Sequence, residues 1–185
     1  MSWDDAKFHR FDDATLRMTR GELPGYGYPH VVFPYAPEDE TTCISAMRSI
    51  PARLSQAGFS NRLISIAQMV TRATARYTRR ELLKADDYRR LQSDLTDLRS
   101  GVVGKITESC VGEIRASGVG DTVVLLCRLG ALYPFGHVST LLDALYRAGI
   151  RNTIAVAYPG TADGTQLRFL GLLDPTGGYR GHVVT

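Results

Sequence analysis

Charged and aromatic side chains gather after two apolar runs in the last third of the 185-residue chain. The runs extend from Thr122 to Cys127 and from Thr153 to Tyr158, and their continuity predicts strands covered on both faces. The loops after such strands lie at the carboxyl edge of the sheet, where open α/β sheets bind ligands. The candidate ligand or partner surface consists of Arg128, Tyr133, Pro134, Phe135, His137, Tyr158, Pro159, Gly160, Asp163, Gly164, Arg168, Tyr179 and Arg180.

These residues fit two kinds of role. If Arg128, Asp163 and Arg168 converge on a pocket, they would suit an enzyme or a nucleotide-binding protein. The alternative is turn chemistry and packing, in which prolines and glycines set the turns while Tyr133 and Phe135 fill the edge of the core. The sequence leaves both readings open.

The residues from Gly101 to Thr107 resemble a phosphate-binding loop only superficially. The first glycine of that motif would fall at Arg99, and Ile106 stands where Ser or Thr must follow the lysine. Gly118 and Gly120 precede a predicted strand, whereas the dinucleotide-binding glycines follow one. Neither nucleotide motif is therefore predicted.

Motifs for nucleophilic catalysis or metal binding are also missing from the sequence. No histidine has a partner four residues away, and no Gly-x-Ser-x-Gly elbow is present. Cys43, Cys110 and Cys127 are too scattered for a zinc site, and we expect reduced thiols. We expect no cofactor and no metal; whether the protein is an enzyme stays open, and a non-enzymatic role is favoured.

The net charge of +3 is too small to indicate a dedicated nucleic-acid-binding protein, and its excess lies in residues 72–115. The candidate nucleic-acid contacts are Arg72, Arg76, Arg79 and Arg80. On one continuous helix, Arg72, Arg76 and Arg80 would share a face that could follow a phosphate backbone. A solvated face is the favoured alternative, because acidic residues follow closely.

The hydrophobic pattern predicts the elements that position these residues. A strand is expected at 31–33, and a helix should open at Pro37 and be interrupted by Pro51. A second strand is expected at 61–70, passing into a helix near Val70. Residues 79–115 should be helical, weakened at their glycines, with one apolar face made of Tyr88, Leu91, Leu95, Leu98, Val102 and Ile106. The strand, helix and strand of residues 122–158 predict a parallel pair. We expect one three-layer α/β domain over residues 1–185, with a mostly parallel central sheet and helices on both faces. Residues 1–30 are expected to be a polar extension with a short helix at 12–20.

The loops after the two apolar runs carry a family resemblance. Residues 130–135 resemble a Gly-x-x-Tyr-Pro-Phe block, and residues 157–171 resemble a Phe-Tyr-Pro-Gly…Asp-Gly-x-x-Leu-x-Leu-Phe-Gly block. Residues 32–40 and 178–180 resemble two further blocks of the same family. Over residues 31–184 the chain is thus similar to the BrxB family of BREX bacteriophage-exclusion systems. It departs from the family pattern at Gly136–Ser139, where Arg-Ser-His is usual, and at Gly177–Gly178, where Asn-Tyr is usual.

The resemblance implies a cytoplasmic adaptor protein without a catalytic residue set, with a PglZ-like protein and other BREX components as partners. A ligand-binding enzyme and a nucleic-acid-binding accessory protein remain the alternatives. A homodimer is also open, because apolar side chains on the central helices could serve a dimer as well as a core. No secretory signal is recognised at the N-terminus, and no apolar run approaches the length of a membrane span, so no membrane association is predicted.

Overall fold

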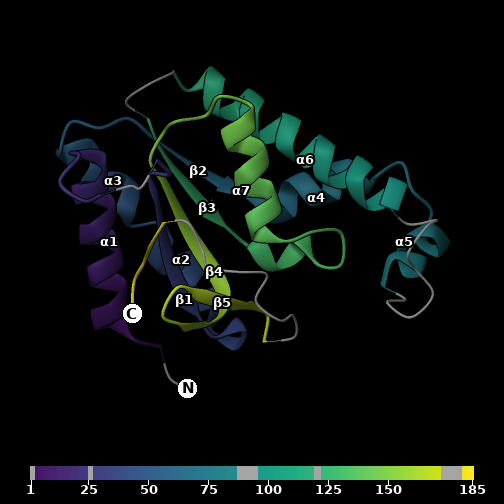
Figure 1. Ribbon diagram of the computed structural model, residues 1–185, viewed down its shortest axis with the longest axis horizontal. Coiled ribbons are helices and arrows are strands. Elements are labelled where there is room, and N and C mark those ends of the chain that lie inside the picture. The colour runs from purple at the N-terminus through teal and green to yellow at the C-terminus, as the bar shows by residue number, and fades with distance from the viewer. Residues whose placement is uncertain (1–2, 25–26, 87–95, 119–121, 172–180) are drawn as a thin grey trace.

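The computed structural model describes residues 3–24, 27–86, 96–118, 122–171 and 181–185, and contains a mostly parallel sheet (Figure 1). Its strands lie in the order β2-β3-β4-β1-β6, and β5 pairs with β4 in antiparallel fashion, while every other pairing is parallel. The strands are β1 (His30–Tyr35), β2 (Asn61–Ser65), β3 (Val123–Cys127), β4 (Ile154–Asp163), β5 (Gln166–Phe169) and β6 (His182–Val183).

Helices cover both faces of this sheet and complete the three layers predicted from the sequence (Figure 1). One face packs against α1 (Asp5–Thr19), α2 (Glu40–Met47) and α3 (Ile50–Gln56), and the other against α4 (Ile66–Thr74), α6 (Thr96–Ala116) and α7 (Val138–Arg147). Successive residues of a strand point to opposite faces, so Leu125 joins the first core and Leu126 the second. Two short helices, η1 (Pro37–Asp39) and η2 (Leu129–Leu132), follow β1 and β3.

Several predicted elements are confirmed. β3 and β4 are parallel neighbours joined through α7, with Leu125 opposite Ala155. A break before Pro51 divides α2 from α3, as predicted. The predicted passage from strand to helix is also present but comes earlier, since β2 ends at Ser65 and α4 begins at Ile66 instead of near Val70. Pro34 lies in β1 beyond the reach of the two-residue β6, so among the described strands β1 has a neighbour on only one side there. Proline is tolerated at such a position because it has no N–H to donate.

The first thirty residues depart from the prediction of a polar extension. The helix α1 begins at Asp5 instead of near residue 12, and the Asp4 carboxylate caps it by accepting the N–H of Lys7 at 2.8 Å. Phe8 and Phe11 are buried against Phe33 of β1, with ring centroids 5.4 Å apart in both cases. The sequence pattern predicted the second half of this helix but missed its first two turns, residues 5–11, because polar residues surround the few apolar ones.

The helical segment after residue 79 also differs from the prediction. Gly101 and Gly104 lie inside α6 and do not divide it; the two described helices are α5 (Arg79–Asp86) and α6, which begins only at Thr96. Val102 and Ile106 are buried on one face of α6, as their spacing predicted. The predicted face also included Tyr88, Leu91 and Leu95, which lie outside the described residues.

Candidate functional site

The carboxyl ends of the parallel strands meet at one edge of the sheet and surround a hollow of about 300 Å³. The chain leaves β1 toward α2 on one face but leaves β2 and β3 toward α4 and η2 on the other, which opens a crevice between them. We call this crevice the carboxyl-edge hollow; it is lined by Pro37, Glu40, Ala67, Arg128, Gly130, Ala131, Pro159 and Leu170. Its position is the one predicted from the strand pattern.

Glu40 and Arg128 are the charged groups that line the hollow. The Arg128 Nε lies 4.0 Å from the Glu40 Oε1, and their side chains are 52% and 31% exposed. The Tyr35 hydroxyl donates to the other Glu40 oxygen. Burial, reinforced by Glu40, raises the pKa of Tyr35 above its usual range, so the phenol keeps its proton and continues to orient the carboxylate. Glu40 therefore presents a fixed acceptor beside a guanidinium that reaches solvent.

Two residues at the hollow have left-handed backbone conformations. Arg128 has φ +59° and Leu170 has φ +54°, and in the described part of the chain these are the non-glycine residues with positive φ. Such a conformation costs an ordinary L-residue roughly 1–2 kcal/mol, which the surrounding packing must offset. That both residues line one hollow indicates that the fold holds its rim in a defined shape.

The described aromatic residues of the candidate set pack in or against the core and are not among the residues that line the hollow. Tyr158 is 4% exposed and lies 5.7 Å from the Phe169 ring, centroid to centroid, and burial raises its pKa above the usual range. His137 lies 6.5 Å from the same ring, and burial followed by the charge of Arg99 lowers its pKa. The partly buried side chains Tyr133 and Phe135 pack against this core, and Pro134 lies between them on a cis peptide bond. Tyr133 and Phe135 thus lie at the edge of the core, where the packing alternative places them.

Gly160 of the Tyr-Pro-Gly block has a steric role. A Cβ at this position would lie 2.1 Å from the Arg168 carbonyl oxygen, and its φ of +150° is one that only glycine adopts readily. The main chain can therefore continue from β4 into the hairpin with β5, where the Leu170 N–H donates to the Pro159 oxygen at 2.9 Å. This contact places Pro159 and Leu170 together in the wall of the hollow.

The remaining described candidates do not converge on the hollow. Asp163 and Gly164 are exposed at the tip of the β4–β5 hairpin, and Arg168 is exposed on β5; none of the three lines the hollow. Tyr179 and Arg180 lie outside the described residues. Of the predicted set, Arg128 and Pro159 line the hollow. The prediction missed the other described lining residues, Pro37, Glu40, Ala67, Gly130, Ala131 and Leu170. Glu40 had been recognised only as part of a helix opening.

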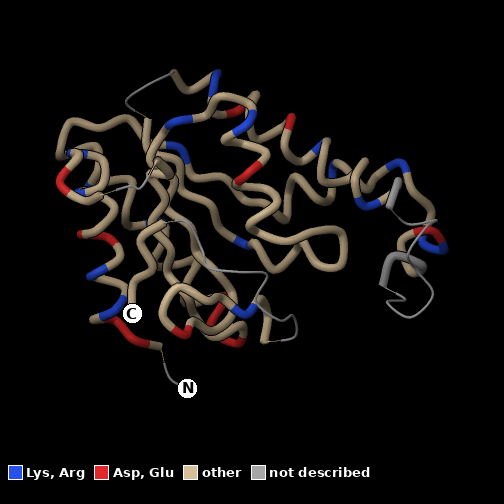
Figure 2. The backbone as a smooth tube through the Cα atoms, viewed as in Figure 1, with Lys and Arg blue, Asp and Glu red and all other residues tan. Residues whose placement is uncertain are grey.

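The arginines of residues 72–80 do not form the predicted stripe. The helix α4 ends at Thr74 and α5 begins at Arg79, so Arg72, Arg76 and Arg80 do not share one helical face. Arg72 forms an ion pair with Glu113 at 3.8 Å, and Arg76 lies over the Tyr77 ring at 4.8 Å. Figure 2 shows basic and acidic segments interleaved along α5 and α6, as on a solvated surface.

A reciprocal cap explains where α5 begins. The Thr78 N–H donates to the Glu81 carboxylate at 2.7 Å, and the Glu81 N–H donates to the Thr78 hydroxyl at 3.3 Å. This Thr-x-x-Glu arrangement is a capping box, which satisfies two N–H groups at the start of a helix. Arg79 and Arg80, which are both exposed, occupy its first turn.

The three thiols and the other potential metal ligands stay apart. Burial raises the pKa of Cys110 to about 12 and that of Cys127 to about 11, and no cysteine is in a disulfide. Within the described ranges, no three His, Cys, Asp or Glu side chains come together in a way that could hold a metal ion. The helices in these ranges include none with the length and apolar composition needed to cross a membrane.

The fold and the site define an α/β protein with a parallel sheet and a crevice at its carboxyl edge. A family model described as BREX protein BrxB matches residues 55–184, which include α4, α6, α7 and the strands from β2 onward. The chain belongs to the BrxB family and is a component of BREX phage-defence systems. A search of curated proteins and a search of solved structures each found no match.

Proposed function

We propose that this protein is a non-enzymatic adaptor of a BREX defence complex, and that the carboxyl-edge hollow receives a segment of a PglZ-like partner. The observation that carries the proposal is the make-up of the hollow. Its walls are mostly small or apolar, with Pro37, Ala67, Ala131, Pro159 and Leu170, and its charges are one arginine and one glutamate. Apolar walls suit an inserted side chain, and the two charges can orient a partner through paired polar contacts.

The shape of the hollow supports the same role. Arg128 and Leu170 keep conformations that a flexible loop would relax, so the rim is preorganised. A preorganised surface loses less conformational entropy on association. The half-exposed Arg128 guanidinium remains able to pair with a partner carboxylate while it lies beside Glu40.

Co-purification tests the proposal. The chain is expressed with the PglZ-like protein of the same defence system, and the dissociation constant is measured by calorimetry. We expect a complex in the micromolar range or tighter, weakened about tenfold or more by Arg128→Glu and by Ala131→Trp, which fills the hollow. The matched control is Lys105→Glu on the exposed side of α6, with the same charge change, and should leave binding within about twofold. No complex at micromolar concentration, or a complex insensitive to both hollow variants, would contradict the proposal.

A second candidate function is small-molecule binding at the same hollow. The observation that favours it is position, because ligands of open parallel sheets bind in the crevice outside the carboxyl ends of the strands. The volume of about 300 Å³ lies at the lower end for ligand pockets. Thermal stabilisation by a nucleotide, abolished by Arg128→Glu but not by Lys105→Glu, would support this function over the adaptor.

A further inference from the structure

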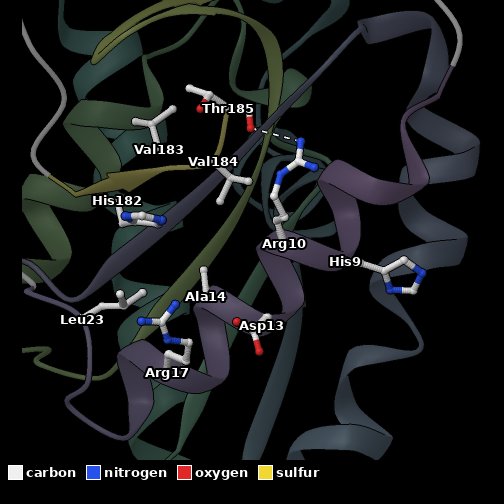
Figure 3. A pocket seen from close by; sticks show the side chains of 10 residues that line it. All are labelled: His9, Arg10, Asp13, Ala14, Arg17, Leu23, His182, Val183, Val184 and Thr185. Carbon is white, nitrogen blue, oxygen red and sulfur yellow. Dashed lines mark hydrogen bonds between the residues drawn. The ribbon is translucent and has the colours of Figure 1, made fainter.

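A second hollow, of about 510 Å³, lies between α1 and the short strand β6 (Figure 3). We call it the α1–β6 groove. Its polar wall comes from α1 through His9, Arg10, Asp13 and Arg17, and its other wall is the strand segment 182–185. Ala14 and Leu23 complete the lining. The helix wall lies outside the residues that the family model matches, so the groove is not explained by the family assignment.

Among the described residues, the strand wall is the edge of the sheet. β6 is the last strand in the described order, and it pairs with β1 through Val31 and Val32. The Val184 N–H donates to the Val32 oxygen at 2.9 Å. Successive residues of a strand direct their backbone groups to opposite sides, so the N–H and C=O of Val183 point away from β1. An extended chain can pair with these groups as an added strand.

The short strand is held firmly enough to act as a template. Gly181, which enters it, has φ +153°, and a Cβ there would lie 2.9 Å from the His30 oxygen. The glycine therefore lets the chain approach the first residue of β1 closely. Val184, which follows the strand, is buried in the core beneath α1. An incoming segment would meet an ordered edge, and the cost of ordering would fall mainly on the segment itself.

The charges of the groove select the kind of segment. Its acidic residue, Asp13, lies 3.6 Å from Arg53, so its charge is offset and the two lining arginines decide the selection. Arg10 and Arg17 extend from α1 toward the strand, with Ala14 between them (Figure 3). Two helical turns separate them, about 10 Å along the helix axis. Alternate residues of an extended chain lie about 7 Å apart on one face, and the long arginine and glutamate side chains can bridge the difference. The Arg10 guanidinium donates to the Thr185 main-chain oxygen at 3.1 Å, and Arg17 lies 3.7 Å from the half-exposed Glu22. Exposed contacts of this kind are weak, so a carboxylate can replace them.

We propose that the α1–β6 groove binds an extended acidic segment of a partner protein, which adds a strand beside β6 and directs carboxylates toward Arg10 and Arg17. The outward N–H and C=O of Val183 give the segment its backbone pairing, and the arginines select the carboxylates. Alternation along a strand places every second side chain on one face, so the recognised pattern is an acidic residue at every second position. This surface is separate from the carboxyl-edge hollow, and its binding does not depend on the proposed adaptor contact there.

The probe is a fluorescein-labelled hexapeptide of alternating Val and Glu with both ends blocked, and the measurement is fluorescence anisotropy with the full chain. A peptide with Lys in place of Glu is the matched control. We expect the Val/Glu peptide to bind with a dissociation constant below about 1 mM, to weaken as salt is raised, and to bind about tenfold more tightly than the Val/Lys peptide. No binding of the Val/Glu peptide up to about 1 mM, or equal binding of the two, overturns the proposal.

Two sets of variants assign the site. The double variant Arg10→Glu with Arg17→Glu should weaken peptide binding about tenfold or more, whereas Lys105→Glu with Arg147→Glu, an equal charge change on the opposite helix layer, should change it less than about twofold. Val183→Pro removes the outward N–H but leaves the Val184 donor to β1 in place, and should weaken binding about fivefold relative to Val183→Ala. Equal binding by the two double variants, or by the two Val183 variants, overturns the proposal.

Two other occupants give different results. If the groove receives a second copy of this chain, sedimentation will show a dimer that the double variant Arg10→Glu with Arg17→Glu dissociates. If it receives nucleic acid, a dodecamer of single-stranded DNA will displace the Val/Glu peptide and bind more tightly than it does. Either result overturns the proposal of a partner polypeptide.

Discussion

The carboxyl-edge hollow and the α1–β6 groove are built in opposite ways. Residues from several strands and helices surround the hollow, and a close backbone contact at Gly160 and two left-handed residues fix its rim. The groove lies between one helix and a two-residue strand, which is held by its pairing with β1, the close approach of Gly181 to His30 and the buried Val184. Side-chain and main-chain packing therefore defines the carboxyl-edge hollow, whereas the main-chain groups of a strand edge and the charges of α1 define the α1–β6 groove.

The largest loss of stability is expected from a substitution at Gly160, beside the hollow. Gly160→Ala places a methyl group 2.1 Å from the Arg168 oxygen, and since that atom belongs to the main chain, β4 and β5 must separate. We expect a loss of about 3 kcal/mol or more in the free energy of unfolding, measured by urea denaturation. The control Gly164→Ala has φ +57° but meets nothing within 4 Å, and should cost about 1 kcal/mol. Equal losses in the two variants would show that the hairpin contact does not constrain the hollow.

A substitution at Phe11 tests whether α1, the helix wall of the groove, is packed as part of the folded core. Phe11 of α1 is fully buried against Phe8 and Phe33. Phe11→Ala should lower the free energy of unfolding by about 3–4 kcal/mol because it leaves a cavity. Leu141→Ala, in the core under α7, should cost a similar amount. A loss below about 1 kcal/mol for Phe11→Ala alone would mean that α1 is an extension and not a wall that supports β6.

Acid should destabilise the fold through His30, the buried first residue of β1. Burial lowers the pKa of His30 from 6.5 to about 4, with the charge of Asp143 acting in the opposite direction, and His30 is 4% exposed. Between these pH values the unfolded chain binds the proton and the folded chain does not, so stability is complete above pH 6.5 and falls as the pH drops toward 4. The loss should be on the order of 2–3 kcal/mol.

Urea denaturation as a function of pH checks this expectation. His30→Gln should be less stable than the wild type above pH 6.5 but should show a shallower loss of stability between pH 6.5 and 4. The exposed His9→Gln should reproduce the wild-type slope. A wild-type slope in His30→Gln would assign the acid sensitivity to other groups.

The smallest effect separates shape from charge at the hollow. Arg128 has φ +59°, a conformation that Asn tolerates and a β-branched residue does not. Arg128→Asn should keep the free energy of unfolding within about 0.5 kcal/mol, whereas Arg128→Val should lose about 1–2 kcal/mol. If both variants have the same free energy of unfolding, the left-handed conformation at residue 128 does not stabilise the rim of the hollow. Partner binding should weaken in both, because both lack the guanidinium.

The strands around the hollow could be predicted because their residues are apolar without interruption. β3 and the first half of β4 are continuous apolar runs, and the loops after them had to reach the carboxyl edge once the strands were parallel. Which side chains enter the hollow could not be predicted. Tyr158 and Pro159 are neighbours that point to opposite sides, and only the register against β1 and the hairpin with β5 decides which of them lines the hollow.

The groove could not be predicted from the sequence. Its walls come from residues 9–23 and 182–185, which no local pattern relates to each other. The side of α1 that lines the groove is mainly polar. Phe8 and Phe11, on the buried side of α1, stabilise the helix through their contact with Phe33, and local helix propensity does not include such a tertiary contact. The arginines do not share one helical face, for a local reason. The capping box at Thr78 starts a new helix between Arg76 and Arg79.

The strand order of the sheet has a consequence for synthesis of the chain. β1 pairs with β4 and β6, and both of these strands come late in the chain. His30 of β1 pairs with Ile154 of β4, which is synthesised 124 residues later. At ribosomal speeds this interval lasts about 6–25 s, during which the apolar residues of β1 lack a sheet neighbour. The β2–β3 pair, by contrast, can form before Ile154 is added. A nascent chain stalled before residue 154 should therefore bind chaperones, and one stalled after β6 has left the ribosome should not.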